Sequence, residues 1–406
     1  MLLTLAWRNL WRRPSRTWLS VASMAIAAAL LTFMLSFQLG VYDTMKASAL
    51  RLFDGYAQLQ PTGYADDPDI AKVLPDAARL AARAAAIPGV SAAAPRGAAY
   101  VVLAHGADSY GAAIEGVEPT AEAKVSTLHA TIRQGRYLRA GDGAAAIMGD
   151  VFARNLGLEV GDSFTLLGAG ADGSLAADRL KLVGVFHTGV AELDRQLAEM
   201  PLARFRDDFD LGAGANLIAL AGPSLSAVNA DLPRLRALAA GRGASVQDWG
   251  ALQPGLKQAI TLDFSIGLLW YASLVVVVVF IILNTLLMSV LERTHEFGAL
   301  LALGMRSDLI GRVLWLELLL LSLLGAGLGV LVGGAVAAWL QSAGIAVGQL
   351  EGLLAQWGMP GRLYPHVSAI SLLAGPLAIV VSVAVGGFVP YLRIRRLEPL
   401  AAMAAP

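Results

Sequence analysis

Four long apolar runs stand out along the chain, and ordinary polar sequence separates the first run from the other three. The runs occupy residues 17–41, 264–291, 309–340 and 367–391. A helix needs roughly 20 apolar residues to cross the hydrocarbon core of a bilayer. Buried helices of soluble proteins rarely combine this length with so few charges, so the pattern predicts four transmembrane helices.

The start of the chain has a second interpretation. A basic segment followed by an apolar run is also the pattern of a cleaved signal peptide, with 47–49 as the cleavage site. Signal peptides have shorter apolar regions, of about 7–15 residues, which favours a retained helix. In residues 1–16, apolar and arginine positions alternate at roughly helical spacing. This spacing predicts an amphipathic helix on the membrane surface, although a plain basic topology signal would look similar.

Arginines indicate the orientation of the four helices. They precede the first run, separate the second from the third, and follow the fourth: Arg8, Arg12, Arg13, Arg16, Arg293, Arg306, Arg393, Arg395 and Arg396. The segment 341–366, between the third and fourth runs, contains only Arg362. Basic residues accumulate on the cytoplasmic side, so we expect both termini and residues 292–308 inside, with 42–263 outside. The tail, residues 392–406, is then cytoplasmic as well.

The long segment 42–263 has the alternating patterns of a mixed domain. Strands are predicted at 56–60, 100–103, 112–116, 163–167, 180–186, 216–221 and 244–248, and helices at 76–87, 149–156 and 224–240. The second strand–helix–strand set repeats the order of the first, which predicts one subdomain split by an insertion at about 120–212. The predicted fold class is therefore an α-helical membrane protein with four transmembrane helices plus an α+β extracytoplasmic domain.

Composition excludes several kinds of chemistry. The charged fraction is 15%, against about 25% in a typical soluble domain, and the net charge of +0 gives no indication of a nucleic-acid partner. The absence of cysteine excludes thiol catalysis and disulfides. No lysine follows a glycine, so a phosphate-binding P-loop is absent, and there is no G-x-S-x-G motif.

Metal-binding patterns are also weak in the sequence. The histidines are scattered and form no close-spaced ligand pair, at His105, His129, His187, His295 and His366. Two acidic groups, 66–69 and 207–210, are interpreted as solvated loop surface. The sequence therefore predicts no catalytic residue, no bound cofactor and no metal site.

Small residues in the third run predict close helix packing. Gly325, Gly329 and Gly333 follow one another at intervals of four, and glycines at this spacing allow a second helix to approach closely in lipid. An unpacked flexible helix is the alternative. Glu317 lies in the same run and is expected either to be paired or to reach the polar interface. Pro376 in the fourth run permits a kink.

The segment 292–308 combines a polar patch with apolar positions. Glu292, Arg293 and Glu296 share helical spacing, and Phe297 and Leu300 are apolar. A short helix with apolar anchors suits a groove on a partner protein. An amphipathic connector lying on the bilayer is the alternative.

Residues 292–304, which read ERTHEFGALLALG, resemble the E-R-x-x-E-[IF]-x-x-L-x-A-[LI]-G signature of FtsX-like, MacB/Lol-type ABC transporter permeases. Other matches lie in corresponding places: AWRNL at 6–10, GRYL at 135–138 followed by LGLEVGD at 156–162, and the tail at 390–400. The resemblance extends over the whole chain.

This resemblance implies a homodimer or heterodimer of permeases in the bacterial inner membrane, among membrane lipids. A cytoplasmic ABC ATPase on a separate chain would bind ATP and Mg. Its contact residues would be Glu292, Arg293, Glu296, Phe297, Gly298, Leu300 and Gly304. The layout is most similar to lipoprotein-releasing permeases, which implies a hydrophobic or lipidated cargo. Efflux of small amphiphiles and control of an extracytoplasmic enzyme are the alternatives, whereas a membrane hydrolase is disfavoured.

Overall fold

The computed structural model describes residues 2–12, 14–292, 298, 301, 305–346, 348, 361–388 and 391–392. The chain divides into two compact units, which we describe separately. We call residues 1–43, 259–346 and 362–406 the membrane unit, and residues 44–258 with 347–361 the α/β unit.

The described part of the membrane unit contains four helices that are long and apolar enough to cross a bilayer. They are α2 (Pro14–Ala49), α10 (Pro254–Glu292), α12 (Ser307–Ala343) and α14 (Ala369–Gly386). These helices confirm the four predicted runs. However, α2 continues past the predicted end at 41, and α10 begins before 264, because the polar residues there, such as Lys46 and Lys257, are themselves good helix formers. The apolar pattern predicts the extent of membrane contact rather than the helix ends.

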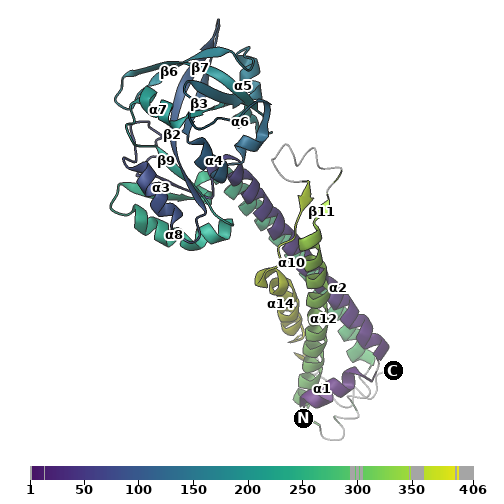
Figure 1. Cartoon of the computed structure of the whole chain (residues 1–406). Coiled ribbons are helices and arrows are strands. Elements are labelled where there is room, and N and C mark those ends of the chain that lie inside the picture. Colours follow the sequence, from purple (N-terminus) through teal and green to yellow (C-terminus); the bar gives the residue numbers. More distant parts are fainter. Residues whose placement is uncertain are drawn as a thin grey trace. The chain divides into compact units, whose positions relative to one another are not determined.

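Side chains from all four helices form the core of the membrane unit. Met24, Ala28 and Leu31 of α2 meet Leu314 and Leu318 of α12, and the cluster also contains Ile282 of α10 with Ile379 and Val383 of α14. Helices α12 and α14 lie side by side (Figure 1). Along the chain, the segment that joins α12 to α14 contains a short two-stranded sheet, in which β11 (Ile345–Ala346) pairs with β12 (Arg362–Leu363).

The first helix, α1 (Leu2–Leu10), is amphipathic as predicted. Ala6 and Leu10 are buried, and α1 packs on α12. Leu3, Leu5 and Trp7 remain exposed. An exposed row of large apolar side chains beside a helix bundle is typical of a helix that lies in the membrane interface.

The α/β unit is built on one ten-stranded sheet with the order β10-β1-β9-β2-β3-β8-β5-β7-β4, where β6 pairs with β2 and β7. The strands are β1 (Ala57–Pro61), β2 (Ala92–His105), β3 (Asp108–Val117), β4 (Ile132–Gly135), β5 (Ala145–Gly149), β6 (Ser163–Ala169), β7 (Leu175–Phe186), β8 (Leu197–Pro201), β9 (Leu217–Ala221) and β10 (Ala244–Asp248). The helices are α3 (Ala77–Ala85), α4 (Pro119–Val125), α5 (Asp150–Asn155), α6 (Ala191–Gln196), α7 (Leu202–Phe209), α8 (Leu225–Ala239) and α9 (Trp249–Leu252). A π-helical turn, η1 (Leu50–Asp54), follows α2, and a 3₁₀ turn, η2 (Leu128–Thr131), precedes β4.

All ten strands and helices predicted in this region are present near their predicted positions, most of them with shifted ends. The sequence did not predict α4, β4, β5, α6, β8, α7 or α9. These elements are short, at most eight residues, and an apolar run of that length does not distinguish strand from helix.

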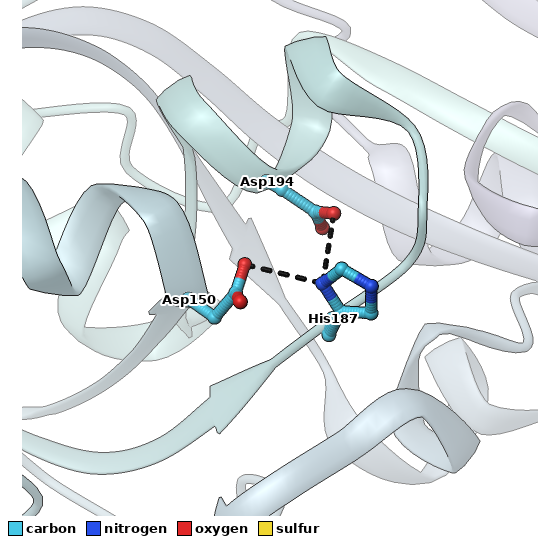
Figure 2. A group of neighbouring side chains, drawn as sticks. All are labelled: Asp150, His187 and Asp194. Carbon is cyan, nitrogen blue, oxygen red and sulfur yellow. Dashed lines mark ion pairs between the residues drawn. The ribbon is translucent and has the colours of Figure 1, made fainter. Parts of the chain in front are cut away.

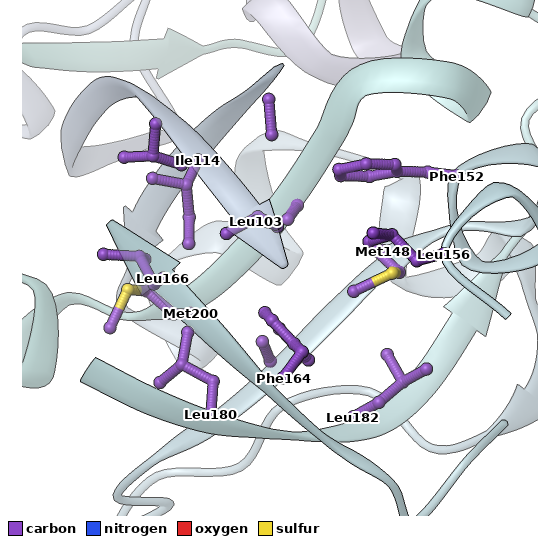
Figure 3. Packing of buried hydrophobic residues seen from close by; sticks show 14 of the residues in the cluster. Leu103, Ile114, Met148, Phe152, Leu156, Phe164, Leu166, Leu180, Leu182 and Met200 are labelled. Atoms are coloured by element: carbon purple, nitrogen blue, oxygen red, sulfur yellow. The ribbon is translucent and has the colours of Figure 1, made fainter. Parts of the chain in front are cut away.

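Two main hydrophobic cores support the prediction of a split subdomain with an insertion. The first core joins residues from both ends of the unit, between Leu50 and Val90 and again between Ala215 and Ala239. The second core contains residues between Val101 and Leu211, including Leu103, Phe152 and Phe164 (Figure 3).

The predicted start of the insertion, about 120, is therefore too late. Strand β2 belongs to both parts: its first half pairs with β9, at Ala92–Arg96, and its second half pairs with β6, at Val102–Ala104. A long strand that serves both cores leaves no loop to mark the boundary in the sequence.

Paired glycines position helix α7 on the hairpin of β2 and β3. Gly97 and Gly116 face each other across the two strands. A Cβ on Gly97 or Gly116 would lie 2.3 or 2.4 Å from atoms of Phe205. The absence of side chains at both positions therefore makes room for the Phe205 ring, which stacks on Phe209 at a centroid distance of 4.4 Å.

Candidate functional sites

The glycine series in α12 faces α2 of the same chain. A Cβ on Gly325 would lie 2.4 Å from the Cβ of Met24, and one on Gly329 would lie 2.4 Å from the Cβ of Ala28. A Cβ on Gly333 would lie 2.5 Å from the backbone oxygen of Ala29. Three successive turns of α12 thus approach α2 more closely than any side chain would allow.

Glu317 has a partner inside the membrane unit. The side-chain amide of Asn9, in α1, donates a hydrogen bond of 2.7 Å to Glu317 Oε1. Glu317 is only 8% exposed. Of the two alternatives expected from the sequence, the structure has the paired one, and this bond links the N-terminal helix to α12.

The predicted ATPase-contact residues lie largely outside the described residues. This applies to Arg293, Glu296, Phe297, Leu300 and Gly304. Glu292 is the last residue of α10, and Gly298 is helical and buried. The role of these residues remains a prediction.

The α/β unit contains a buried charge cluster that the sequence did not predict. Arg96, in β2, is completely buried and donates two hydrogen bonds, of 2.9 and 2.7 Å, to the carboxylate of Glu122 in α4. It also donates to the backbone oxygen of Phe53 at 2.6 Å and lies 4.7 Å from the centre of the Phe53 ring. Glu115, in β3, is 3.4 Å away. One arginine thus joins η1, β2, β3 and α4.

A second carboxylate pair extends this cluster. Glu199, in β8, lies opposite Glu115 in the parallel β3–β8 pair and accepts a 2.9 Å hydrogen bond from the Tyr137 hydroxyl. Burial raises the pKa of Glu115 to about 7, although Arg96 opposes this change. Burial and the neighbouring Glu122 raise the pKa of Glu199 to about 8. One arginine cannot compensate three carboxylates, so the last two retain protons near neutral pH.

The same face of the sheet continues from this cluster into an open cleft. Side chains alternate across a strand, so Ala98, Tyr100 and Val102 share the face of Arg96. A cleft of about 720 Å³, lined in part by Gln60, Tyr64, Tyr100, Glu115 and Leu217, covers this area.

A shallower hollow of about 390 Å³ adjoins the cleft and shares Tyr100 with it. Val102, Gly111 and Leu167 also line it. Tyr100 is 78% exposed, Val102 43% and Leu167 39%. We call Tyr100, Val102 and Leu167 the apolar patch. The cleft and the hollow together form a mixed polar and apolar surface, which is suited to binding.

Sequence reasoning missed these sites for a common reason. Arg96 is separated from Glu115 and Glu122 by long stretches of chain, and no spacing rule connects them. The scattered histidines are a second example: the fold places His187 Nδ1 3.3 Å from carboxylate oxygens of both Asp150 and Asp194. The sequence had predicted no metal ligands at all, and it offered no local signal for this group.

Comparisons with known proteins cover both units. Residues 17–235 match the family model of the MacB-like periplasmic core domain, and residues 269–399 match that of the FtsX-like permease C-terminal domain. No curated protein matches the chain.

Solved structures give more distant similarities. The extracellular domain of the ABC-type transporter YknZ from Gram-positive bacteria is 13% identical, with a TM-score of 0.34 over 47% of this chain and 97% of that one. The periplasmic region of MacB from Actinobacillus actinomycetemcomitans is 12% identical, with a TM-score of 0.36 over 50% of this chain and 92% of that one.

The two family models together cover most of the apolar helices, most of the α/β unit between the first two of them, and the segment with the E-R-x-x-E signature. The first model alone covers more than half of the chain. The chain therefore belongs to the family of FtsX-like ABC transporter permeases with a MacB-like periplasmic core domain.

Proposed function

We propose that the chain is the membrane subunit of a transporter in which a separate cytoplasmic ABC ATPase drives extraction or export of a lipidated, lipoprotein-like cargo. The proposal of a separate ATPase rests on the combination of both permease domains with the absence of any P-loop in the sequence. ATP hydrolysis would then occur on a partner chain. Motion would pass through the segment around Glu296 into α10 and α12, which flank that segment.

The apolar patch supports the proposal that the cargo is lipidated. Contiguous apolar side chains at a hollow beside a polar cleft can hold an acyl chain while polar groups contact the attached peptide. Gly111 contributes to this opening, since a Cβ built on it would meet nothing within 4 Å.

Coupling to the ATPase is tested by Glu296→Lys. Charge reversal at an interface creates like-charge contacts that cost several kcal/mol, and about 1.4 kcal/mol corresponds to tenfold in affinity. We expect the variant to insert normally but to lose copurifying ATPase and substrate-stimulated ATP hydrolysis. Glu351→Lys, in the segment predicted on the opposite side of the membrane, is the matched control. Full ATPase recovery with Glu296→Lys would show that coupling occurs elsewhere.

Cargo binding is tested by Tyr100→Asp. A charge in the apolar patch should reduce photo-crosslinking of a lipidated peptide to the full chain about tenfold, because an acyl chain does not tolerate a neighbouring carboxylate. Leu175→Asp is the control, since Leu175 is equally exposed, at 78%, and does not line the hollow. Equal crosslinking in both variants would exclude the patch. If the unmodified chain crosslinked the unlipidated peptide as well as the lipidated one, the result would favour a different cargo.

A further inference from the structure

Three side chains from separate elements of the α/β unit converge on one point (Figure 2). Asp150 is the first residue of α5, His187 directly follows β7, and Asp194 lies in α6. His187 Nδ1 is 3.3 Å from Asp150 Oδ1 and also 3.3 Å from Asp194 Oδ2. All three ligand atoms lie within 4.8 Å of one another.

Hydrogen bonding alone explains this arrangement poorly. A charge-assisted N–H···O bond usually measures about 2.7–2.9 Å, and the single proton of Nδ1 would have to be shared between two oxygens, both at the longer distance of 3.3 Å. In contrast, two donors bound to one tetrahedral ion, with bonds of about 2.0–2.1 Å, are separated by about 3.3–3.4 Å. Both distances at His187 Nδ1 fit that separation.

Asp150 provides a second, independent observation. Its Oδ2 accepts a 2.7 Å hydrogen bond from Arg154. Its Oδ1, which faces the histidine, is buried and has no hydrogen-bond partner among the described residues. A buried carboxylate oxygen normally has a donor or a cation, so this oxygen is available as a ligand.

Neighbouring residues hold the Asp194 side chain and the backbone of His187 in position. Asp194 Oδ1 accepts 2.8 Å bonds from both the amide and the hydroxyl of Thr188, and Oδ2 accepts a 3.0 Å bond from the amide of Gly189. The His187 amide donates to the oxygen of Thr131 at 3.0 Å. Such outer contacts orient the ligands of protein metal sites.

Close packing also places the two aspartates together. A Cβ on Gly149 would lie 2.3 Å from the backbone oxygen of Asp194. Only glycine therefore allows the start of α5 to approach α6 closely enough for the carboxylates of Asp150 and Asp194 to face the same point.

We infer that Asp150 Oδ1, His187 Nδ1 and Asp194 Oδ2 bind a divalent transition-metal ion of the Zn²⁺ type. An imidazole with two carboxylates suits Zn²⁺ better than Ca²⁺ or Mg²⁺, which prefer oxygen ligands alone. The His187 side chain is 45% exposed, so an ion can enter from solvent and a water can fill the fourth position. The ion would connect α5, the end of β7 and α6.

The test is a metal titration of the full chain in detergent after removal of metal with a chelator. We expect one Co²⁺ per chain, with the visible absorption of a four-coordinate ion, displaced by Zn²⁺. Zn²⁺ should also raise the unfolding temperature, because it binds only the folded state. His187→Gln and Asp150→Asn should each weaken binding by about tenfold or more.

His366→Gln is the matched control. His366 contacts the carboxylate of Asp43 in the membrane unit, and no third ligand joins this pair among the described residues. This variant should bind Zn²⁺ as the unmodified chain does. Absence of saturable binding, unchanged affinity in both His187→Gln and Asp150→Asn, or an equal loss in His366→Gln would each overturn the inference.

Discussion

At the residue scale, the dominant feature of the α/β unit is Arg96. It is the largest fully buried side chain in the described structure, and its contacts reach η1, β3 and α4. Removing one partner from a buried ion pair leaves uncompensated charge in a medium of low dielectric constant. This single residue therefore stabilises the junction between the two cores.

Arg96→Met should strongly destabilise the α/β unit. The variant leaves the buried Glu122 carboxylate without its cation, and the expected loss is about 3–5 kcal/mol. Chemical denaturation of the full chain in detergent measures it. Arg234→Met is the control, because the Arg234 side chain is 65% exposed in its pair with Asp231 and should cost about 0–1 kcal/mol. Similar losses in both variants would contradict a special role for burial.

The buried glutamates make stability depend on pH. The folded pKa values of Glu115 and Glu199, about 7 and about 8, lie above the ordinary value of 4.5. The folded state therefore binds more protons than the unfolded state. The stabilisation is complete below about pH 4.5 and decreases as pH rises through about 7 to 8.

We expect the free energy of unfolding to fall by on the order of 6 kcal/mol between pH 5 and 9, since each unit of pKa difference corresponds to about 1.4 kcal/mol. Glu199→Gln should flatten this dependence, because an amide has no proton to lose. Exposed Glu159, changed to Gln, should preserve it. Thermal unfolding at a series of pH values measures all three proteins, and an unchanged slope in Glu199→Gln would assign the effect to other groups.

At the element scale, α2 and α12 form a close helix pair in the membrane unit. Their contact depends on Gly325, Gly329 and Gly333, which bring the backbones together and so increase dispersion contacts where lipid offers no hydrophobic driving force. The sequence suggested close packing with a helix that it could not identify. In the structure that helix is α2.

Gly329→Leu should disrupt this pair. Its side chain would collide with Ala25 and Ala28, and overpacking of this kind costs about 1–3 kcal/mol. We expect lower thermal stability in detergent and a lower yield of assembled complex. Gly327→Leu is a stringent control on the same helix, since a Cβ built on Gly327 meets nothing within 4 Å. If the two variants behaved alike, the glycine spacing would have no packing role.

At the scale of the whole molecule, the functional proposal depends on orientation. The arginine distribution predicts that the α/β unit lies outside the cytoplasm and that the start of α12 lies inside. The chain has no cysteine, so single introduced cysteines report their side of the membrane without background.

Leu175→Cys should react with a membrane-impermeant maleimide in cells whose outer membrane alone is permeabilised. Ser307→Cys should react only after the inner membrane is opened. Leu175 is highly exposed, so accessibility does not limit its labelling. Protection of residue 175, or labelling of residue 307 in sealed cells, would reverse the topology and remove the basis for ATPase contact at 292–304.

The sequence by itself determined the four apolar helices, the amphipathic first helix, most longer strands of the α/β unit and the family signature. Each depends on periodicity or composition within a short window, where side-chain spacing along a helix or strand is set by backbone geometry. Tertiary structure alone decided the partner of the α12 glycines, the division of β2 between two cores, the pairing of Arg96 with Glu122, and the meeting of His187 with Asp150 and Asp194. These contacts join residues that are distant in the chain. Their geometry depends on strand register and helix docking, which many weak packing interactions determine together.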